Sequence, residues 1–593
     1  MGLLRFQRFR EELARCLPAA GLLLVPLAAS PRFADQFTSV KWYVLEALAA
    51  VWLLVERVLG GSSGSPAFVR RARLACAGTV ALVVLGSLRR GPGWALEPLL
   101  ARACFTLLAL SSFWHFRRSG LRLAPSRAAL GASAAVVIAL GLFQFLDLRP
   151  LPWLTAGDHL SATFGNVNMA AQFVGLAIVA LLSRTAEGGD SGRSRLEASL
   201  LPLLVGAGLA YLHLLGTRSV LLALTAAFLF LTVAGRRSTL LRAATAAALI
   251  AALLVFLVRL VAGHAGRLEP EATAHKRDSA RLRLAVWSDT LRLIADHPLG
   301  VGAGSFEQAF IPYALGGRSR PDESLVFRSP HNDYLRVLAE EGVVTTAVLA
   351  SLLALLLVAL HRSPLIGSWR SPPGLLLGSF AVFLSVEAVF QFPFEMAFPS
   401  LMAAVMLGLA WACLETDREA TAPEAGASWR GAVWAVVAAG VLWGLGRVAT
   451  AEYLSVNARG DVGAQERACR LDARRLEACV NAAWLRIEAG DRRAGRSLLV
   501  AVLARAPHYF PAIKLLGEDS LARGDRETGC RYLAVYDGLF DGRSSVHERL
   551  AGDCEPGAVE AVRREVPIPR YRAFPLTPAD AALRPQAVGR YWK

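Results

Sequence analysis

The sequence predicts an all-α fold: a polytopic helical membrane protein with a long loop on one membrane face and a C-terminal soluble α-helical repeat domain. Two observations lead to this fold class. The chain has 593 residues, of which 54% are hydrophobic and only 19% are charged, a composition typical of multi-pass membrane proteins. Apolar runs close to the ~20 residues that cross a bilayer recur along the chain, which gives about 12–13 transmembrane helices.

Thirteen apolar segments are the expected membrane spans, although the third, fourth and twelfth are short or interrupted. They centre on Leu13–Ala29, Trp42–Val58, Leu74–Leu88, Leu99–Trp114, Ala128–Leu146, Asn168–Leu182, Leu200–Leu215, Val220–Ala234, Leu241–Val261, Val343–Leu360, Leu375–Phe392, Leu401–Cys413 and Ala432–Leu445. The basic N-terminus precedes the first run without a small-residue cleavage site. We therefore expect a retained first helix rather than a removed signal peptide.

The basic residues of the loops orient the bundle. With the N-terminus inside and sides alternating through the ninth helix, seventeen arginines fall in inner segments. The short outer loops hold only Arg32, Lys41, Arg89, Arg90, Arg149 and Arg218. This asymmetry follows the positive-inside rule, and the net charge of +17 is explained by topology and headgroup contact. No recognition-helix or zinc-finger pattern accompanies it, so nucleic acid is not an expected partner.

This topology divides the chain into four parts. Residues 1–261 hold helices one to nine, and residues 262–342 form an outer loop with an amphipathic helix and a polar motif. Residues 343–447 hold helices ten to thirteen, and residues 448–593 form a soluble tail on the same outer side.

The tail is expected to be a helical repeat domain. Gly490-Asp491-Arg492 recurs as Gly524-Asp525-Arg526 at an offset of 34 residues, and this period resembles tetratricopeptide repeats. Four cysteines lie in the tail, where an oxidising compartment would permit disulfides whose pairing the sequence does not define. They are Cys469, Cys479, Cys530 and Cys554. No C-x-x-C pair indicates a zinc site, and no metal site is expected.

Polar residues gather in three outer loops. SATFGNVNMAAQF brings Asn166 and Asn168 to the start of helix six, and a tight turn places Arg218 between helices seven and eight. The long loop is the third. An arginine at the membrane is a functional candidate by default, but snorkelling to lipid headgroups explains Arg218 equally well.

In the long loop, Arg281–Asp296 is predicted to be an amphipathic helix. Its apolar stripe of Leu284, Trp287, Leu291 and Ile294 would lie on the membrane surface or on the bundle, with Arg283 at the edge. An ordinary interfacial role for Arg283 stays open. The helix should stop at His297-Pro298, and the following GVGAGSF is predicted to be a tight, closely packed turn. It is not a nucleotide loop, because no strand precedes it and no Gly-Lys-Ser follows.

The stretch RSPHNDYLRVLAEEG precedes the tenth span. Ser329-Pro330 predicts a helix start, with the serine as cap, which would place His331 and Asn332 in the first turn. The field of the helix N-terminus suits an anion and favours neutral imidazole. Glu340, further along, could pair with an arginine. The alternative for His331 is a hydrogen-bonded structural histidine.

These stretches resemble known motifs. SPHNDYLRVLAEEGVV resembles the H-N-x-x-L-x-x-x-x-E-x-G signature of the O-antigen ligase and polymerase-like family. It is matched at His331, Asn332, Leu335, Glu340 and Gly342. The upstream segment is similar to the family's R-x-x-x-W…P-L-x-G-x-G-x-x-F pattern through Arg283, Trp287, Pro298, Gly300, Gly302, Gly304 and Phe306. TFGNVNMAA looks like its F-G-N-x-N element, and Thr217–Ser219 is close to S-R-G, with serine replacing glycine.

The resemblance covers roughly residues 10–415. It implies a metal-independent membrane glycosyltransferase of the C class, in the bacterial inner membrane, with no cofactor. Such enzymes work on the periplasmic side with glycans carried on undecaprenyl diphosphate. The acceptor is lipid A–core for a ligase of lipopolysaccharide biosynthesis, another glycan for a polymerase, or a protein for an O-oligosaccharyltransferase, and these three stay open. No Asp-x-Asp sugar-nucleotide motif occurs in the chain.

This resemblance leads to a hypothesis for the residue roles. Arg218 and Arg283 would stabilise the departing diphosphate, because guanidinium binds phosphate bidentately. His331 would act as general base. The residues expected to bind or orient substrate are Asn332, Asn166, Asn168, Glu340 and Trp287. The tail, 448–593, would offer a docking surface for a periplasmic protein or the acceptor, or would merely cap the enzyme.

A non-enzymatic alternative is a lipid-linked glycan transporter or a membrane-anchored repeat scaffold. A transporter should show internal sequence repeats and ionisable groups near the bilayer midplane. The sequence has no repeated halves, and its polar residues gather on one face. A scaffold would not need Arg218 or His331, so the enzyme is favoured.

Overall fold

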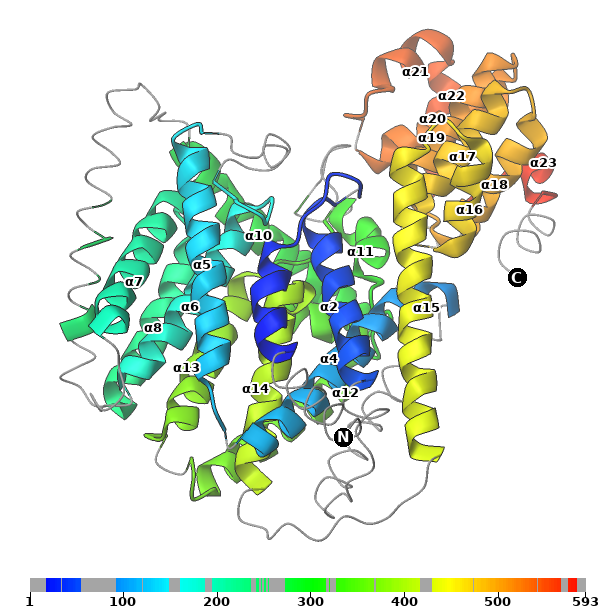
Figure 1. Ribbon diagram of the computed structural model, residues 1–593. Coiled ribbons are helices and arrows are strands. Elements are labelled where there is room, and N and C mark those ends of the chain that lie inside the picture. Colours follow the sequence, from blue (N-terminus) through cyan, green and yellow to red (C-terminus); the bar gives the residue numbers. More distant parts are fainter. Residues whose placement is uncertain are drawn as a thin grey trace. The chain divides into compact units, whose positions relative to one another are not determined.

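The computed structural model confirms an all-α protein, with helices and no strand among the residues it describes. These are residues 17–33, 35–54, 92–119, 121–148, 160–186, 195–235, seven positions between 242 and 254, 272–315, 319, 327–366, 369–415, 429–472, 474–540, 542–566 and 574–583. The chain forms two compact units. Figure 1 labels the helices.

The first unit, here the membrane unit, comprises Met1–Val80, Leu99–Glu271 and Val348–Leu445. Its helices are Leu17–Leu27, α2 (Thr38–Leu53), most of α4 (Pro92–Ser119), α5 (Ala124–Phe145), α6 (Val167–Ala186), α7 (Arg195–Leu215), α8 (Arg218–Ala234), α13 (Pro372–Phe390), the short η3 (Pro393–Glu395) and α14 (Ala397–Glu415). Helix starts follow local chemistry. At α13 the Ser371 hydroxyl accepts from the Gly374 N–H, and Pro372 occupies the first helical position.

Six described helices are long and apolar enough to cross a membrane. They are Ala124–Phe145, Val167–Thr185, Asp333–Arg362, Pro372–Phe390, Ala397–Leu414 and Ala435–Asn457. The expected spans Leu74–Leu88 and most of Leu241–Val261 lie outside the described residues, and each of the other expected spans overlaps a described helix. The prediction of a polytopic helical membrane protein is therefore confirmed.

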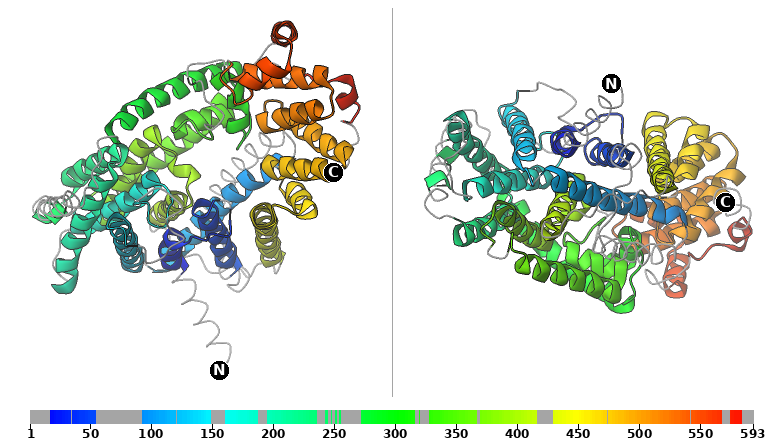
Figure 2. Two further views of the ribbon diagram at one scale, coloured as in Figure 1. Left: turned by 90° about the horizontal axis from the view of Figure 1, so that it is seen from above. Right: turned by 60° about the horizontal axis from the view of Figure 1, so that its bottom comes forward.

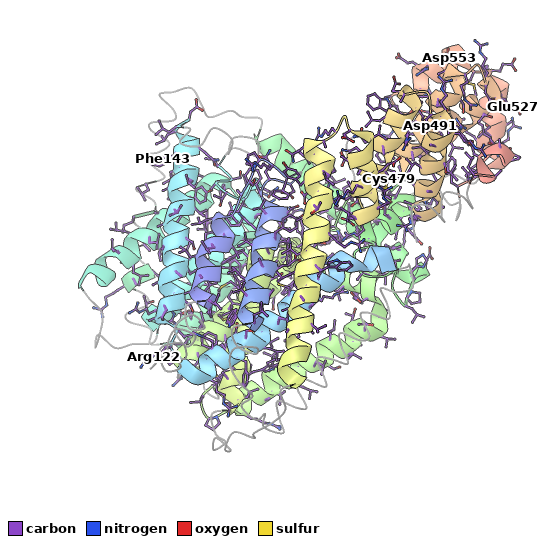
Figure 3. The ribbon with its side chains drawn as sticks, turned by 45° about the vertical axis from the view of Figure 1, so that its right-hand side comes forward. Arg122, Phe143, Cys479, Asp491, Glu527 and Asp553 are labelled. Atoms are coloured by element: carbon purple, nitrogen blue, oxygen red, sulfur yellow. A yellow bond between two sulfur atoms is a disulfide. The ribbon has the colours of Figure 1, made fainter. Side chains whose placement is uncertain are left out.

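The surface of these helices is suited to lipid. On α12 (Asp333–Arg362), Leu353 and Leu355 are 57% and 65% exposed. Exposure of such apolar side chains is unfavourable in water but not in the hydrocarbon core of a bilayer. Between the helices, an apolar core includes Phe173, Phe383 and Phe398. Figure 3 shows Phe143 near one end of α5 and Arg122 just before its other end.

The second unit, here the loop–tail unit, comprises Ala81–Pro98, Ala272–Ala347 and Gly446–Lys593. Its loop helices are α10 (Ala272–Asp296), α11 (Phe306–Leu315) and the first part of α12. Its tail helices are the end of α15 (Trp429–Asn457), α16 (Val462–Leu471), α17 (Leu476–Glu488), α18 (Arg492–Arg505), α19 (Phe510–Ala522), α20 (Arg526–Leu539), α21 (His547–Asp553), α22 (Pro556–Glu565) and α23 (Pro578–Ala581). In Figure 2 the tail helices, yellow to red, pack beside one another.

The repeated Gly-Asp-Arg triplet makes two similar helical hairpins. Gly490 and Gly524 have φ of 85° and 80°, the left-handed backbone that ends a helix and favours glycine. Asp491 and Asp525 then cap α18 and α20, because their side chains accept from the N–H groups of the residues three positions on. The 34-residue offset thus corresponds to α17–α18 and α19–α20.

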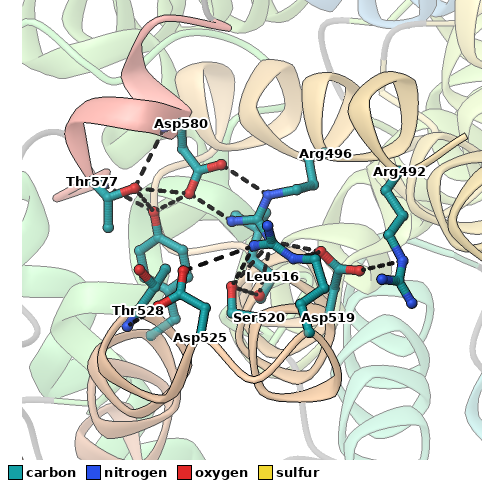
Figure 4. A network of polar contacts seen from close by, with 11 residues as sticks. Arg492, Arg496, Leu516, Asp519, Ser520, Asp525, Thr528, Thr577 and Asp580 are labelled. Atoms are coloured by element: carbon teal, nitrogen blue, oxygen red, sulfur yellow. Dashed lines mark hydrogen bonds and ion pairs between the residues drawn. The ribbon is translucent and has the colours of Figure 1, made fainter.

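Two disulfides and a buried ionic network hold the tail together. Cys469 pairs with Cys479, and Cys530 pairs with Cys554. Arg496 of α18 donates to Asp519 of α19 at 2.6 Å and to Asp580 of α23 at 2.7 Å. Figure 4 shows this guanidinium between the two carboxylates. Because removing one partner would leave a buried charge unpaired, the network specifies how α18, α19 and α23 meet.

Candidate functional site

The long loop folds largely as the sequence predicts. Helix α10 ends at Asp296, directly before His297-Pro298. The expected stripe is split: Leu284 and Leu291 are exposed, as a face on a membrane surface requires. The face that packs inside the unit is a different one, with Val286 and Leu293 buried.

The part of α12 that precedes Gly342 is here called the motif helix. The backbone of the GVGAGSF turn packs directly against the end of this helix. The N–H groups of Val301 and Gly302 donate to the carbonyls of Ala339 and Glu340, both at 2.9 Å. A side chain at Gly300 would overlap the backbone of Glu340 to Gly342, and one at Gly342 would overlap the backbone of Leu299 and Gly300. The glycines are therefore required by this contact, which confirms the prediction of a tight, closely packed turn.

The motif helix starts later than predicted. Helix α12 begins at Asp333, and the Asn332 side chain accepts from the Leu335 N–H at 3.0 Å, so Asn332 is the cap. The prediction that Ser329 caps the helix and Pro330 occupies its first position is wrong. His331 lies before the cap with φ of 52°, a backbone conformation that is strained for a β-carbon-bearing residue. The helix breaks at Gly342 (φ 81°), where the motif gives way to the apolar span.

Two residues of α10 act on His331. The Trp287 indole N–H donates to the Pro330 carbonyl at 2.9 Å, which holds the backbone directly before the histidine. Burial, and next the positive charge of Arg283, lower the pKa of His331 from 6.5 to about 4. Burial and a nearby guanidinium thus favour the neutral imidazole, whereas the sequence indicated the field of a helix N-terminus as its cause, and His331 lies before the helix. The structure thus brings His331 together with Arg283 and Trp287.

Glu340 supports this arrangement from inside the motif helix. It accepts from the Phe306 N–H at 3.2 Å, which fixes the start of α11. It also forms an ion pair with Arg336 at 3.5 Å, so the expected arginine partner lies one turn away on the same helix. A contact of Glu340 with substrate stays a prediction.

The other predicted residues lie at one end of the membrane unit, where α6 and α8 begin and α13 ends. Asn166 caps α6, because its side chain accepts from the Asn168 N–H at 2.9 Å. Gly165, with φ of 68°, lies against the Phe37 ring, where any larger residue would overlap. The F-G-N-x-N element is thus a helix start that needs both its glycine and its first asparagine.

A buried glutamate joins this element to the arginine turn. Arg218 is exposed and opens α8. Its neighbour Ser219 donates to Glu387 of α13 at 3.2 Å, and Gln172 of α6 donates to the same carboxylate oxygen at 3.2 Å. Glu387 is fully buried. The first two polar clusters therefore meet through one carboxylate.

Glu387 is a residue that sequence reasoning missed. The available signal was a single acidic residue inside an otherwise apolar span, which is costly in a membrane and marks a functional candidate. Lys41 is a second one. This buried ammonium donates to the carbonyls of Ala28 and Thr163 at 2.6 and 2.7 Å, so it ties two connecting loops together at the same end.

The predicted site residues thus fall into two groups. His331, Asn332, Arg283, Trp287 and Glu340 are gathered in the loop–tail unit, while Asn166, Asn168 and Arg218 belong to the membrane unit. Among the described residues, no group of three or more His, Cys, Asp or Glu is arranged to hold a metal ion.

The fold and these sites define a multi-pass helical membrane protein with polar residues gathered at helix ends. Residues 203–350 match the family described as O-antigen ligase. The matched stretch contains Arg218, Arg283 and His331. The family is one of glycosyltransferase-type membrane enzymes. None of the curated proteins compared with the chain matches it.

Glu387→Ala should destabilise the membrane unit, because Gln172 and Ser219 would lose their common acceptor. The expected cost is about 1 to 3 kcal/mol, since a buried donor left unpaired bears its full desolvation penalty. Glu387→Gln, which keeps one acceptor oxygen, is the matched control and should cost less. Thermal unfolding of the purified full chain measures both. Equal stability of the alanine variant and the unchanged protein would contradict this role.

Proposed function

We propose that the protein is a glycosyltransferase of the O-antigen ligase type. It transfers a glycan from undecaprenyl diphosphate to an acceptor hydroxyl, on lipid A–core or a growing polysaccharide, at the periplasmic face of the inner membrane. The observation that carries the proposal is a neutral, partly buried His331 beside the Arg283 charge, inside the region that matches this family.

The two side chains suit the two halves of the reaction. The acceptor oxygen forms a bond to the anomeric carbon, and the bond from that carbon to the diphosphate oxygen breaks. The proton of the acceptor hydroxyl passes to His331. The negative charge of the departing undecaprenyl diphosphate is stabilised by Arg283 and Arg218, because guanidinium keeps its charge and binds phosphate oxygens in pairs.

Binding of the glycan donor would raise the pKa of His331. With a pKa near 4 in the free protein, His331 is unprotonated but only weakly basic. A bound diphosphate places negative charge beside Arg283 and offsets the charge that lowers this pKa. The pKa of His331 then rises toward neutral pH, where a general base is most effective. The imidazole thus becomes basic when the glycan donor is present.

Three features support the periplasmic orientation and the use of the remaining polar residues. The two disulfides of the tail are typical of an oxidising compartment. The loops expected inside hold most of the basic residues. Asn166 and Asn168 lie at the same end of the membrane unit as Arg218, where their amide groups can bind sugar hydroxyls or orient the site. The surface polysaccharide of a deletion strain tests the acceptor class, since loss of capped core indicates a ligase.

His331→Ala should leave the protein folded and inserted but reduce glycan transfer by ~100-fold or more, the usual contribution of a general base. Transfer from a purified lipid-linked glycan to its acceptor measures the loss. His361→Ala, which removes a histidine from the other end of α12, is the control and should retain activity. Near-normal transfer by the His331 variant would remove the proposed role.

Replacement of Arg218 or Arg283 by lysine should impair glycan transfer. If each contact to the diphosphate is bidentate, Arg218→Lys and Arg283→Lys should impair transfer nearly as much as the alanine variants, because a lysine ammonium cannot reproduce the planar fork. Steady-state transfer rates of the four variants decide this. Full activity of both lysine variants would show that a single positive charge is sufficient.

The pH dependence should show two different acid limbs. The limb of kcat/KM reports the free enzyme, so activity should be lost only as pH falls through about 4, the pKa of His331. The limb of kcat reports the complex with substrate, where the diphosphate charge raises that pKa, so it should lie at higher pH. Acid limbs in the reverse order would contradict the proposed charge compensation.

A further inference from the structure

Helix α11 of the long loop carries two apolar stripes. Phe306, Phe310 and Ala314, each four residues apart, lie on one side and pack in the loop's own small core with Phe327 and Ala339. Four-residue spacing keeps side chains on one side of a helix. This stripe attaches α11 to α10 and to the motif helix.

The second stripe of α11 packs into the tail. Ile311 and Leu315, again four residues apart, belong to the apolar cluster that forms the core of the tail. Leu315 is 93% buried there, with 7% of its surface exposed. The left view of Figure 2 shows the green loop helices next to the orange and red tail helices. A short helix of the loop is thus also part of the tail's core.

Charged and polar groups of the loop and the tail also lie near the place where α11 packs into the tail. Tyr509 lies directly before α19 and stacks near Phe510, with ring centroids 6.4 Å apart. Burial raises the pKa of Tyr509, the negative charges of Glu477 and Glu307 add to this rise, and the positive charge of Arg328 opposes it. Glu307 lies in the first turn of α11 and Arg328 lies three residues before His331, so charges on both sides of the loop act on this tail tyrosine.

The contact continues from α11 to the motif itself. The first N–H of α11, that of Phe306, donates to Glu340, and Glu340 lies in the helix that Asn332 caps. The Tyr313 hydroxyl donates to Asp296 of α10 at 2.8 Å, at the end of the helix that bears Arg283 and Trp287. One face of α11 therefore holds both elements that position His331.

We propose that the tail is a brace for the histidine motif: by burying Ile311 and Leu315 it fixes α11, and α11 fixes the helix starts that place His331 beside Arg283. The tail residues that receive this stripe are positioning residues. The part of this inference that concerns transfer rests on the proposed function, whereas the part that concerns the backbone does not.

Hydrogen–deuterium exchange on the full chain in lipid nanodiscs tests the brace. Leu315→Ser, and the milder Leu315→Ala in case the serine variant does not fold, should speed exchange in 306–315 and 333–341 by about tenfold or more, because these backbones would lose their support. Transfer by the same variants should fall in kcat with KM for the glycan donor unchanged. The control is Trp484→Ala, which removes a 46% exposed aromatic side chain from the tail and should leave exchange in both segments unchanged.

The outcomes separate the brace from other roles of the tail. Faster exchange in both segments for the Leu315 variants, with the control unchanged, supports the brace. This holds even if the protein without substitutions does not transfer glycan. Such a lack of transfer would contradict the proposed function and not the brace. Unchanged exchange with lost transfer would overturn the brace and favour a docking surface. Unchanged exchange with unchanged transfer would overturn it as well.

Discussion

The proposed function depends on one electrostatic contact: the charge of Arg283 acts on a partly buried His331. Burial and this guanidinium lower the pKa of His331 and favour its neutral form. In the proposed function the same guanidinium binds the diphosphate, whose negative charge offsets that effect. The contact exists because α10 and the turn that follows it are held against both ends of the motif helix. The Trp287 indole holds the Pro330 carbonyl, and the backbones around Gly300 and Gly342 touch directly.

Much of the fold and part of the candidate site could be predicted from the sequence. Apolar length predicts the spans, and spacing predicts α10 and its end, because these properties are local. The start of the motif helix was predicted wrongly, since Ser329 and Asn332 are both good caps and only packing decides between them. Glu387 was missed, because its importance depends on partners from two distant helices, Gln172 and Ser219. The pairing of the tail cysteines depends in the same way on how α16, α17, α20 and α21 fold together.

The tail shares its apolar core with a helix of the long loop. A repeat domain that follows the last span would ordinarily be regarded as a separate module for binding partners. Here the loop helix α11 contributes Ile311 and Leu315 to the tail's core, so loop and tail form one compact unit. In the proposed brace, the support of the loop between two membrane helices would come from the tail rather than from the bilayer.

The proposed function requires that Arg218 act on the same diphosphate as Arg283 and His331. The most direct measurement is cross-linking of Arg218→Cys with His331→Cys in intact cells by a short bis-maleimide. If the proposed function is right, both cysteines react with an impermeant maleimide from the periplasmic side and the pair is cross-linked. Labelling from opposite sides of the membrane, or separate labelling without a cross-link, would contradict it.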